Sequence, residues 1–286
     1  MKTFRESLLE VQQQNSSHVC IGLDPDVKLM PKGRTGQVIG HGSLAMRLQD
    51  FALEIVAATA KFACIFKPNA AFWAAHGAER ELANVIDFIL SKGLPVILDA
   101  KRGDIDNTAR LYAQECFQRY GASAVTVNAY LGTDTLKPWL EYGPEKGIFV
   151  LCHTSNPGAD EFQERVLTSF TTADSHQLFI EVAKKATARQ TDATACVGLV
   201  MGATFPVQLG ALVNAGIPET TPLLIPGIGK QAGALEETLG YARKFPFVVN
   251  SSRAIIHASQ DRNFAEVAAQ KAMELRDQIN KVLAAV

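Results

Sequence analysis

Residues 96–108 read Val-Ile-Leu-Asp-Ala-Lys-Arg-Gly-Asp-Ile-Asp-Asn-Thr, an apolar strand that opens into a charged loop. Asp99 and Lys101 are two residues apart, so both side chains leave the same face of a regular strand. Gly103 interrupts the strand, and Asp104 follows beyond the turn. Partly buried charged groups lose favourable interactions with water, and a purely structural role does not fully compensate for that loss. The stretch therefore predicts an active site with a tuned ammonium group.

The apolar part of this stretch is one of several short β-rich runs that alternate with helical patterns. The predicted strands are 18–23, 63–67, 95–98, 122–127, 147–152, 195–201, 222–225 and 246–250. The predicted helices are 44–61, 74–91, 107–120, 177–190, 233–244 and 263–285. Nearly continuous apolar strands separated by helices are typical of a parallel sheet with a covered outer face. The pattern predicts the α/β class and a closed (β/α)8 TIM barrel, in preference to an open doubly wound sheet.

No linker divides the chain, so we expect a single barrel domain over residues 1–286. Two segments that follow predicted strands, 24–43 and 153–171, are longer than simple connections. In a barrel both lie on the rim at the carboxyl ends of the strands, where catalytic residues gather. They are either lids or disordered insertions, and the sequence leaves both interpretations open.

The charge balance argues against bulk electrostatic partners. The chain has 28 Lys and Arg against 29 Asp and Glu, a net charge of −1. Nucleic acid and anionic membranes are therefore not expected partners. No apolar run reaches the ~18 residues that span a membrane. The N-terminal sequence contains no signal-peptide core, so we expect a cytoplasmic protein.

The cysteines and histidines give no indication of a metal site or a disulfide framework. The cysteines are 5 in number and widely separated, and none forms a CxxC pair. The 6 histidines lack the HxxxH spacing of a zinc site. We expect no bound metal, and nothing in the sequence demands a cofactor.

Polar residues follow most of the predicted strands at the point where each strand ends. They are Asp24 after the first strand, Lys67 at the end of the second, Asp99 and Lys101 after the third, Thr154-Ser155-Asn156 after the fifth, Pro226 to Gly233 after the seventh, and Ser251-Ser252-Arg253 after the eighth. The carboxyl ends of barrel strands meet at one mouth, so these side chains are predicted to converge. Independent surface residues have no reason to occupy matching strand ends.

The last two of these segments resemble a phosphate site. Gly227, Gly229 and Gly233 allow the backbone to approach an anion closely, and a helix start offers free N–H groups. Arg253 can add a bidentate charged contact, and Ser252 precedes another short helix. Barrels often bind phosphate after strands seven and eight.

Taken together, these residues resemble the orotidine 5′-phosphate decarboxylase family, in its longer bacterial variety, from about residue 20 to residue 253. The most specific element is Asp99-x-Lys101-x-x-Asp104-Ile105-x-x-Thr108, supported by Lys67 and by Pro226-Gly227-Ile228-Gly229. The resemblance implies a homodimeric barrel that converts orotidine 5′-monophosphate to UMP and carbon dioxide without metal or cofactor. It also implies that Asp104, Ile105 and Thr108 reach into the neighbouring subunit's site.

The residues suit that chemistry. Loss of carbon dioxide from the pyrimidine C6 leaves a carbanion in the ring plane, where the π system cannot delocalise it. Lys101 is the candidate that stabilises this carbanion and then protonates it. Asp99 would lie near the departing carboxylate, where like-charge repulsion can raise the ground state. Lys67 and Asp104 would hold the charges in alternating order.

The remaining roles are binding roles that the resemblance implies. They are Asp24 and Thr108 on the ribose, Ser155 on the pyrimidine amide edge, and Gln231 with Arg253 on the phosphate. The chain departs from shorter relatives at Ser252, where those relatives usually have glycine. The 24–43 segment also has no counterpart in them.

Two other functions remain as alternatives. A sugar-phosphate enzyme with the same barrel and the same Asp-x-Lys-x-x-Asp motif would use a magnesium-stabilised enediolate. Such enzymes resemble this chain at strand three but carry an acidic metal ligand at the end of strand two, where this chain has Lys67. A non-catalytic barrel that senses UMP is the second alternative, although binding alone does not need two lysines alternating with two acids.

Overall fold

The computed structural model describes residues 2–33, 38, 40–168, 175–227 and 232–285. The barrel strands are β1 (Val19–Leu23), β2 (Ile65–Pro68), β3 (Ile97–Arg102), β4 (Ala124–Val127), β5 (Gly147–His153), β8 (Cys196–Met201), β9 (Leu223–Pro226) and β10 (Phe247–Ser251). The α-helices are α1 (Phe4–Asn15), α2 (Leu44–Thr59), α3 (Ala70–Ala74), α4 (Glu79–Ser91), α5 (Asp106–Gln114), α6 (Lys137–Leu140), α7 (Leu178–Thr187), α8 (Pro206–Asn214), α9 (Ala232–Ala242), α10 (Arg253–Ile256) and α11 (Phe264–Ala285). Shorter turns are η1 (Ala60–Phe62), η3 (Thr133–Leu136) and η4 (Pro157–Glu161), and η2 (Glu115–Arg119) is a single π-helical turn.

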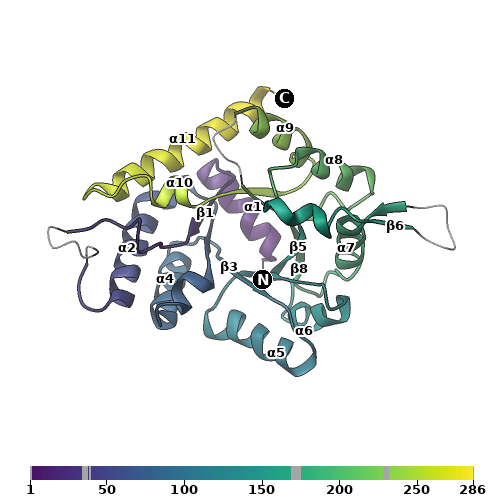
Figure 1. Cartoon of the computed structure of the whole chain (residues 1–286), viewed down its shortest axis with the longest axis horizontal. Helices are drawn as coiled ribbons and strands as arrows, with labels where there is room; N and C mark the ends of the chain where they lie inside the picture. Colours follow the sequence, from purple (N-terminus) through teal and green to yellow (C-terminus); the bar gives the residue numbers. More distant parts are fainter. Residues whose placement is uncertain (1, 34–37, 39, 169–174, 228–231, 286) are drawn as a thin grey trace.

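The eight strands form one parallel sheet in the order β2-β1-β10-β9-β8-β5-β4-β3. Isolated parallel bridges between Phe66 and Val96 and between Asn69 and Asp99 join β2 to β3 and close the sheet on itself. Helices surround the strands, as Figure 1 shows. The predicted (β/α)8 barrel is therefore confirmed.

The strands are buried along most of their length because helices cover the outside of the sheet and side chains fill its interior. All five residues of β1 and all six of β8 are buried. The long helices bury one stripe each: α2 places Leu48, Phe51 and Ile55 against the barrel. Its first turn is capped by the Ser43 hydroxyl, which accepts the N–H of Met46 at 3.3 Å.

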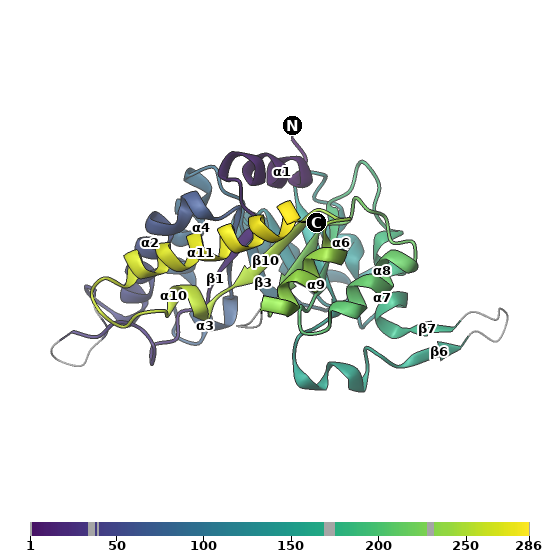
Figure 2. The ribbon, with the colours of Figure 1, turned by 90° about the horizontal axis from the view of Figure 1, so that it is seen from above.

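Helix α1 covers the amino ends of the strands. Phe4 packs edge-on against Phe149 of β5 with ring centroids 6.0 Å apart, and the Gln12 side chain donates to the carbonyl of Phe247 at 2.7 Å. Phe247 is the first residue of β10. Figure 2 shows α1 along one edge of the barrel and the segments that follow β1 and β5 along the opposite edge. The carboxyl ends of the strands therefore form the mouth of the barrel.

Most predicted elements differ from the observed ones only by small shifts of their ends, and three differ further. The third strand runs to Arg102 instead of ending at residue 98. Its pairing with β4 shifts register between Leu98 and Arg102, and the charged residues Asp99 and Lys101 lie within this irregular part of the strand. The helix predicted over 74–91 is divided between α3 and α4 at Gly77, whose φ of 62° ends the first helix. The helix predicted over 107–120 becomes α5 followed by the π-helical turn η2.

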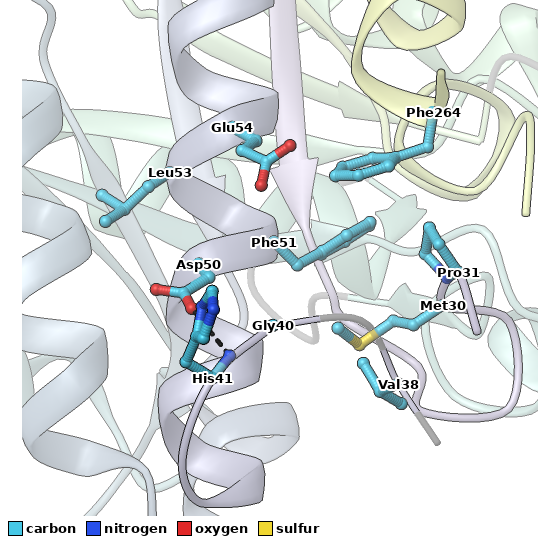
Figure 3. Close-up of a pocket in the computed structure, with 10 residues that line it drawn as sticks. All are labelled: Met30, Pro31, Val38, Gly40, His41, Asp50, Phe51, Leu53, Glu54 and Phe264. Carbon is cyan, nitrogen blue, oxygen red and sulfur yellow. Dashed lines mark hydrogen bonds between the residues drawn. The ribbon is translucent and has the colours of Figure 1, made fainter. Parts of the chain in front are cut away.

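The rim segment after β1 packs against α2 and the start of α11. Figure 3 shows Met30 and Val38 facing Phe51 and Phe264 across a cavity of about 420 Å³. The cavity is also lined by Pro31, Gly40, His41, Asp50, Leu53 and Glu54. The described lining of the cavity contains none of the residues predicted for the active site. Its lining residues come from the rim segment, α2 and α11, and these contacts hold the segment against the side of the barrel.

The rim segment after β5 contains structure that the sequence did not indicate. Its described part comprises η4 and an antiparallel hairpin of β6 (Val166–Thr168) and β7 (Ser175–Gln177). The hairpin projects from the body of the barrel in Figures 1 and 2.

Among the described residues, no helix has the length and apolar character needed to cross a membrane.

Gly198 in β8 is required by the packing of the barrel interior. A Cβ at this position would lie 2.7 Å from the Phe149 ring and 2.7 Å from the Pro222 carbonyl oxygen. We therefore expect Gly198→Ala to lower the free energy of unfolding by about 1–3 kcal/mol, as overpacked cores do. Urea denaturation measures the change.

The matched control is Gly240→Ala in α9, where an added Cβ would meet nothing within 4 Å. Alanine is the better helix former by about 1 kcal/mol, so this variant should be as stable as the original chain or more stable. Equal effects of the two substitutions would contradict the packing argument.

Candidate active site

Three charged side chains meet where β2 and β3 reach the mouth. The Asp99 carboxylate lies between two ammonium groups: its Oδ2 is 2.9 Å from Lys67 Nζ, and its Oδ1 is 2.6 Å from Lys101 Nζ. Lys67 and Asp99 are buried, whereas the Lys101 side chain is 50% exposed. Lys101 is thus the member of the cluster that a ligand in the mouth can reach.

The charges of this cluster stabilise one another. Burial on its own would raise the pKa of Asp99, but the ammonium groups of Lys67 and Lys101 outweigh it and lower that pKa to about 2. For Lys67, burial favours the neutral amine, and the carboxylates of Asp99 and Asp24 outweigh this effect and raise its pKa. At neutral pH Asp99 and Lys67 therefore form a charged pair.

The backbone of Lys101 adopts an unusual conformation. Its φ is 46°, in the left-handed region that residues other than glycine rarely occupy. Lys101 lies within the irregularity where the pairing of β3 with β4 passes from Leu98 directly to Arg102. Such a conformation costs about 1–3 kcal/mol and persists only where the surroundings impose it. The bulge brings the ammonium group back onto Asp99.

Sequence reasoning missed Thr126, which lies on the neighbouring strand β4 and is 1% exposed. Its hydroxyl donates to Asp99 Oδ1 at 2.8 Å and accepts the backbone N–H of Lys101 at 3.0 Å. A threonine within an apolar strand is an ordinary β-former. Thr126 contacts the charged cluster only because β4 lies beside β3 in the folded chain.

Asp24 and Ser252 form a second polar pair at the mouth. The Ser252 hydroxyl donates to Asp24 Oδ2 at 2.6 Å. Asp24 Oδ1 is buried and accepts no hydrogen bond from the residues that the structure describes. A buried acceptor without a donor is costly, and a ligand hydroxyl would satisfy it. Gly22 makes room for this pair, because a Cβ there would lie 2.7 Å from Ser252 Cβ.

Ser155 lies against the ends of β8 and β9. A Cβ at Gly202 would be 2.8 Å from the Ser155 backbone nitrogen, and one at Gly227 would be 3.0 Å from Ser155 Cβ. Gly227 has a φ of 91°, so glycine is needed there for conformation as well as for space. The ends of β5, β8 and β9 therefore come together at this residue.

A network of buried and half-buried polar groups fastens the segment around Ser155 to its neighbours, and the sequence did not indicate it. His153 is fully buried, and its Nε2 is 3.0 Å from Glu164 Oε1. The same oxygen accepts a hydrogen bond from Gln208 of α8 at 2.9 Å. The backbone N–H of Thr154 donates to the Gln163 side chain at 2.8 Å. These contacts hold the start of the rim segment in place.

Asp104, Ile105 and Thr108 lie apart from the cluster within one chain. Among the described residues, no hydrogen bond or ion pair joins Asp104 to the three charged residues, and its Oδ1 accepts the backbone N–H of Ile105 at 2.8 Å. Ile105 is 53% exposed, and Thr108 is exposed at the start of α5. The structure thus brings together three of the four predicted charges.

The predicted phosphate-binding residues are described only in part. Arg253 is exposed at the first position of α10, directly after Ser252. Gln231 and Gly229 lie outside the described residues. Around the described mouth, the site offers a half-exposed ammonium group, a buried acceptor at Asp24 and an exposed guanidinium group. This set suits an anionic ligand that carries hydroxyl groups.

Comparisons with known proteins show the family to which the chain is similar. The family model described as "Orotidine 5'-phosphate decarboxylase / HUMPS family" matches residues 17–268. The orotidine 5′-phosphate decarboxylase of Paracidovorax citrulli is 43% identical over 282 residues, which cover 97% of this chain and 98% of that protein. The enzyme of Cupriavidus taiwanensis is 43% identical over 284 residues, with 98% of each chain covered.

The solved structures give the same result. The structure of Leishmania donovani OMP decarboxylase superimposes with a TM-score of 0.80 at 32% identity and covers 100% of both chains. A Toxoplasma gondii structure titled as a putative orotidine-monophosphate decarboxylase has a TM-score of 0.82 at 30% identity and covers 99% of this chain and 97% of that one. The chain described here belongs to the orotidine 5′-phosphate decarboxylase family.

Proposed function

We propose that the chain catalyses the decarboxylation of orotidine 5′-monophosphate to UMP and carbon dioxide, the last step of de novo pyrimidine nucleotide biosynthesis. The observation that carries the proposal is the Lys67–Asp99–Lys101 cluster at the mouth of the barrel. A charged nucleotide substrate does not cross membranes unaided, which supports a cytoplasmic location.

Lys101 is proposed to supply the positive charge that the reaction needs. The bond between C6 and the carboxylate carbon breaks, carbon dioxide leaves, and the electron pair stays on C6. Opposite unit charges about 4 Å apart attract each other by ~4 kcal/mol at an effective dielectric constant near 20. Lys101 Nζ then gives a proton to C6, which yields UMP, and the neutral amine recovers its proton from water.

Asp99 holds Lys101 without blocking it. An ammonium group has three N–H donors, and Asp99 Oδ1 occupies one of them. The half-exposed side chain leaves the other donors available to the substrate. Asp99 would face the substrate carboxylate, and Lys67 compensates the negative charge from the buried side. Because the charges are already in position, little reorganisation is needed in the transition state.

The binding roles follow the groups around the cluster. Asp24 Oδ1 is a buried acceptor suited to a ribose hydroxyl. Ser155 lies close to the ends of two further strands and is proposed to contact the pyrimidine amide edge. Arg253 is exposed beside Ser252 and is proposed to bind the phosphate together with Gln231. Remote phosphate contacts can contribute to the rate by offsetting distortion at the reacting carbon.

The two alternatives are not favoured. A magnesium-dependent sugar-phosphate enzyme needs an acidic ligand where β2 ends, and this chain has the buried ammonium group of Lys67 there. A cation at that position repels a divalent metal ion. A sensor of UMP would gain nothing from the strained backbone of Lys101.

We also propose a homodimer in which Asp104, Ile105 and Thr108 complete the neighbouring site. The support is the exposure of large apolar side chains just before α5, on α5 and in the segment after β4. They are Ile105 at 53%, Leu111 at 57%, Tyr130 at 81% and Leu131 at 54%. Large exposed apolar groups that cluster on a surface are typical of an interface. A second copy related by a two-fold axis would cover this surface.

Lys101→Ala tests the catalytic assignment. We expect decarboxylation to fall by far more than tenfold, a loss above ~1.4 kcal/mol, because the carbanion loses its countercharge. UMP should still bind, since the other contacts remain. The loss of substrate absorbance, followed in EDTA, measures turnover, and isothermal titration calorimetry measures UMP binding. Activity within tenfold of the original chain would show that the role given to Lys101 is wrong, and loss of activity in EDTA would favour the metal-dependent alternative.

Complementation tests the shared site. We expect Lys101→Ala and Asp104→Ala homodimers to be nearly inactive, because each lacks one charge in both sites. In a mixed dimer one site has lost both groups and the other has both intact, so the mixed dimer should have about half of the original activity, and the unfractionated co-expressed mixture about a quarter. Purification through two different affinity tags isolates the mixed dimer. If Asp104 acts within its own chain, mixing restores nothing.

Asp99→Asn tests the charge cluster through stability. The substitution leaves Lys67 charged and buried without its anion, so the free energy of unfolding at pH 7 should fall by about 3–5 kcal/mol. The pKa of Asp99 is about 2 in the folded protein and lower than in the unfolded chain. The difference in the free energy of unfolding between the original chain and the Asp99→Asn variant should therefore be complete above pH ~4 and disappear as the pH falls toward ~2.

Urea unfolding at several pH values measures this difference. The matched control is Asp87→Asn, which removes the same charge from an exposed position on α4. It should change the stability by no more than about 0.5 kcal/mol. Equal stability of the Asp99→Asn variant and the original chain at pH 7 would contradict the proposed charge compensation.

A further inference from the structure

The hydroxyl oxygen of Thr126 contacts both the backbone of Lys101 and the carboxylate of Asp99. Its hydroxyl accepts the backbone N–H of Lys101 at 3.0 Å and donates to Asp99 Oδ1 at 2.8 Å. The same Asp99 oxygen is 2.6 Å from Lys101 Nζ. The three contacts close a ring that runs from the backbone of Lys101, through Thr126 and Asp99, to the side-chain nitrogen of Lys101.

The Thr126 hydroxyl takes the place of the backbone acceptor that regular pairing of β3 with β4 would offer to the Lys101 N–H. The pairing of β3 with β4 passes from Leu98 to Arg102, so Lys101 lies outside the regular register. Its N–H is therefore available to Thr126 Oγ1, and regular pairing resumes where Asn128 N–H donates to the Arg102 carbonyl at 2.8 Å. Without Thr126 this N–H would lose its hydrogen-bond acceptor on β4, so the hydroxyl favours the left-handed conformation of Lys101.

The second hydrogen bond fixes the carboxylate. A hydroxyl has one proton to donate, and Thr126 gives it to Asp99 Oδ1. Oδ2 is then directed at Lys67, with a distance of 2.9 Å. Thr126 itself is 1% exposed and lies behind the carboxylate on β4, so it acts through its neighbours.

We propose that Thr126 is a positioning residue for the reaction: it holds Lys101 in its left-handed backbone conformation and orients Asp99, so that the ammonium group faces the mouth. The reaction that it serves rests on the function proposed above. Misplacement of a reacting group by about 1 Å can lower the rate about 10²-fold, so a residue that aims Lys101 should affect turnover much more than binding.

Thr126→Val tests the proposal, because valine keeps the branched shape and removes both hydrogen bonds. We expect kcat to fall about 30- to 100-fold, with KM for orotidine 5′-monophosphate and the affinity for UMP within about threefold of the original values. Thr126→Ser retains the hydroxyl and should restore kcat to within about fivefold of the original value. Steady-state kinetics and calorimetric titration with UMP give these numbers.

Thr59→Val is the matched control. Thr59 is also fully buried, and its hydroxyl donates to the Ile55 carbonyl at 2.7 Å. It lies at the end of α2, next to Ala60, whose carbonyl accepts a hydrogen bond from Asn15 of α1. This is the end of the barrel opposite the mouth. The control should lose a similar amount of stability while its kcat stays within about twofold of the original value.

The backbone of Lys101 gives a readout that does not depend on activity. In a crystal structure of the Thr126→Val variant, we expect φ of Lys101 to leave the left-handed region. If the valine variant does not fold, Thr126→Ala removes the same hydrogen bonds without adding a methyl group and is measured in its place.

The proposal is overturned if the valine or alanine variant keeps kcat within threefold, if serine does not rescue it, or if Lys101 keeps its φ of 46° without the hydroxyl. A fall in kcat equal to that of Thr59→Val would also overturn it, since it would reflect general destabilisation. An original chain that does not decarboxylate the substrate contradicts the proposed function instead, and the Lys101 backbone still decides the role of Thr126.

Discussion

The Asp99 carboxylate connects the closure of the barrel to its chemistry. Among the described residues, β2 and β3 are joined by isolated bridges, whereas the other neighbouring strands form longer ladders. The ion pair between Lys67 on β2 and Asp99 on β3 crosses this seam. The same carboxylate holds Lys101 at the mouth. Loss of the anion would therefore weaken the seam and misplace the reactive ammonium group together, which makes the charge cluster a structural as well as a catalytic feature.

This arrangement shows how a barrel can hold unfavourable local features at its mouth. Lys101 has a strained backbone, and Asp24 carries a buried acceptor that no residue in the described part of the chain satisfies. Neither feature stabilises the folded chain. Both lie at strand ends, where the surrounding core is large and the amino ends of the strands are covered by α1. The rigid barrel compensates for the strain, and the substrate gains from groups that are already in position.

Much of the fold and part of the site could be predicted from the sequence. Apolar strands separated by helices predicted the barrel, because that repetition leaves few other ways to bury both faces of a parallel sheet. The Asp99 and Lys101 pairing followed from their spacing at a strand end, although a bulge and not regular alternation brings them together. Thr126 and the His153–Glu164 contact could not be found, because each depends on which elements are neighbours in space. The β6–β7 hairpin was missed because its strands are three residues long and largely exposed.

The close contact between Gly22 and Ser252 has a consequence for the evolution of this mouth. The two positions are far apart in the chain, yet a β-carbon at one would occupy the space of the side chain at the other. A lineage can enlarge position 22 only after position 252 has become smaller, and a serine at 252 confines position 22 to glycine. The pair should covary among homologous sequences, with the order of replacement imposed by steric exclusion.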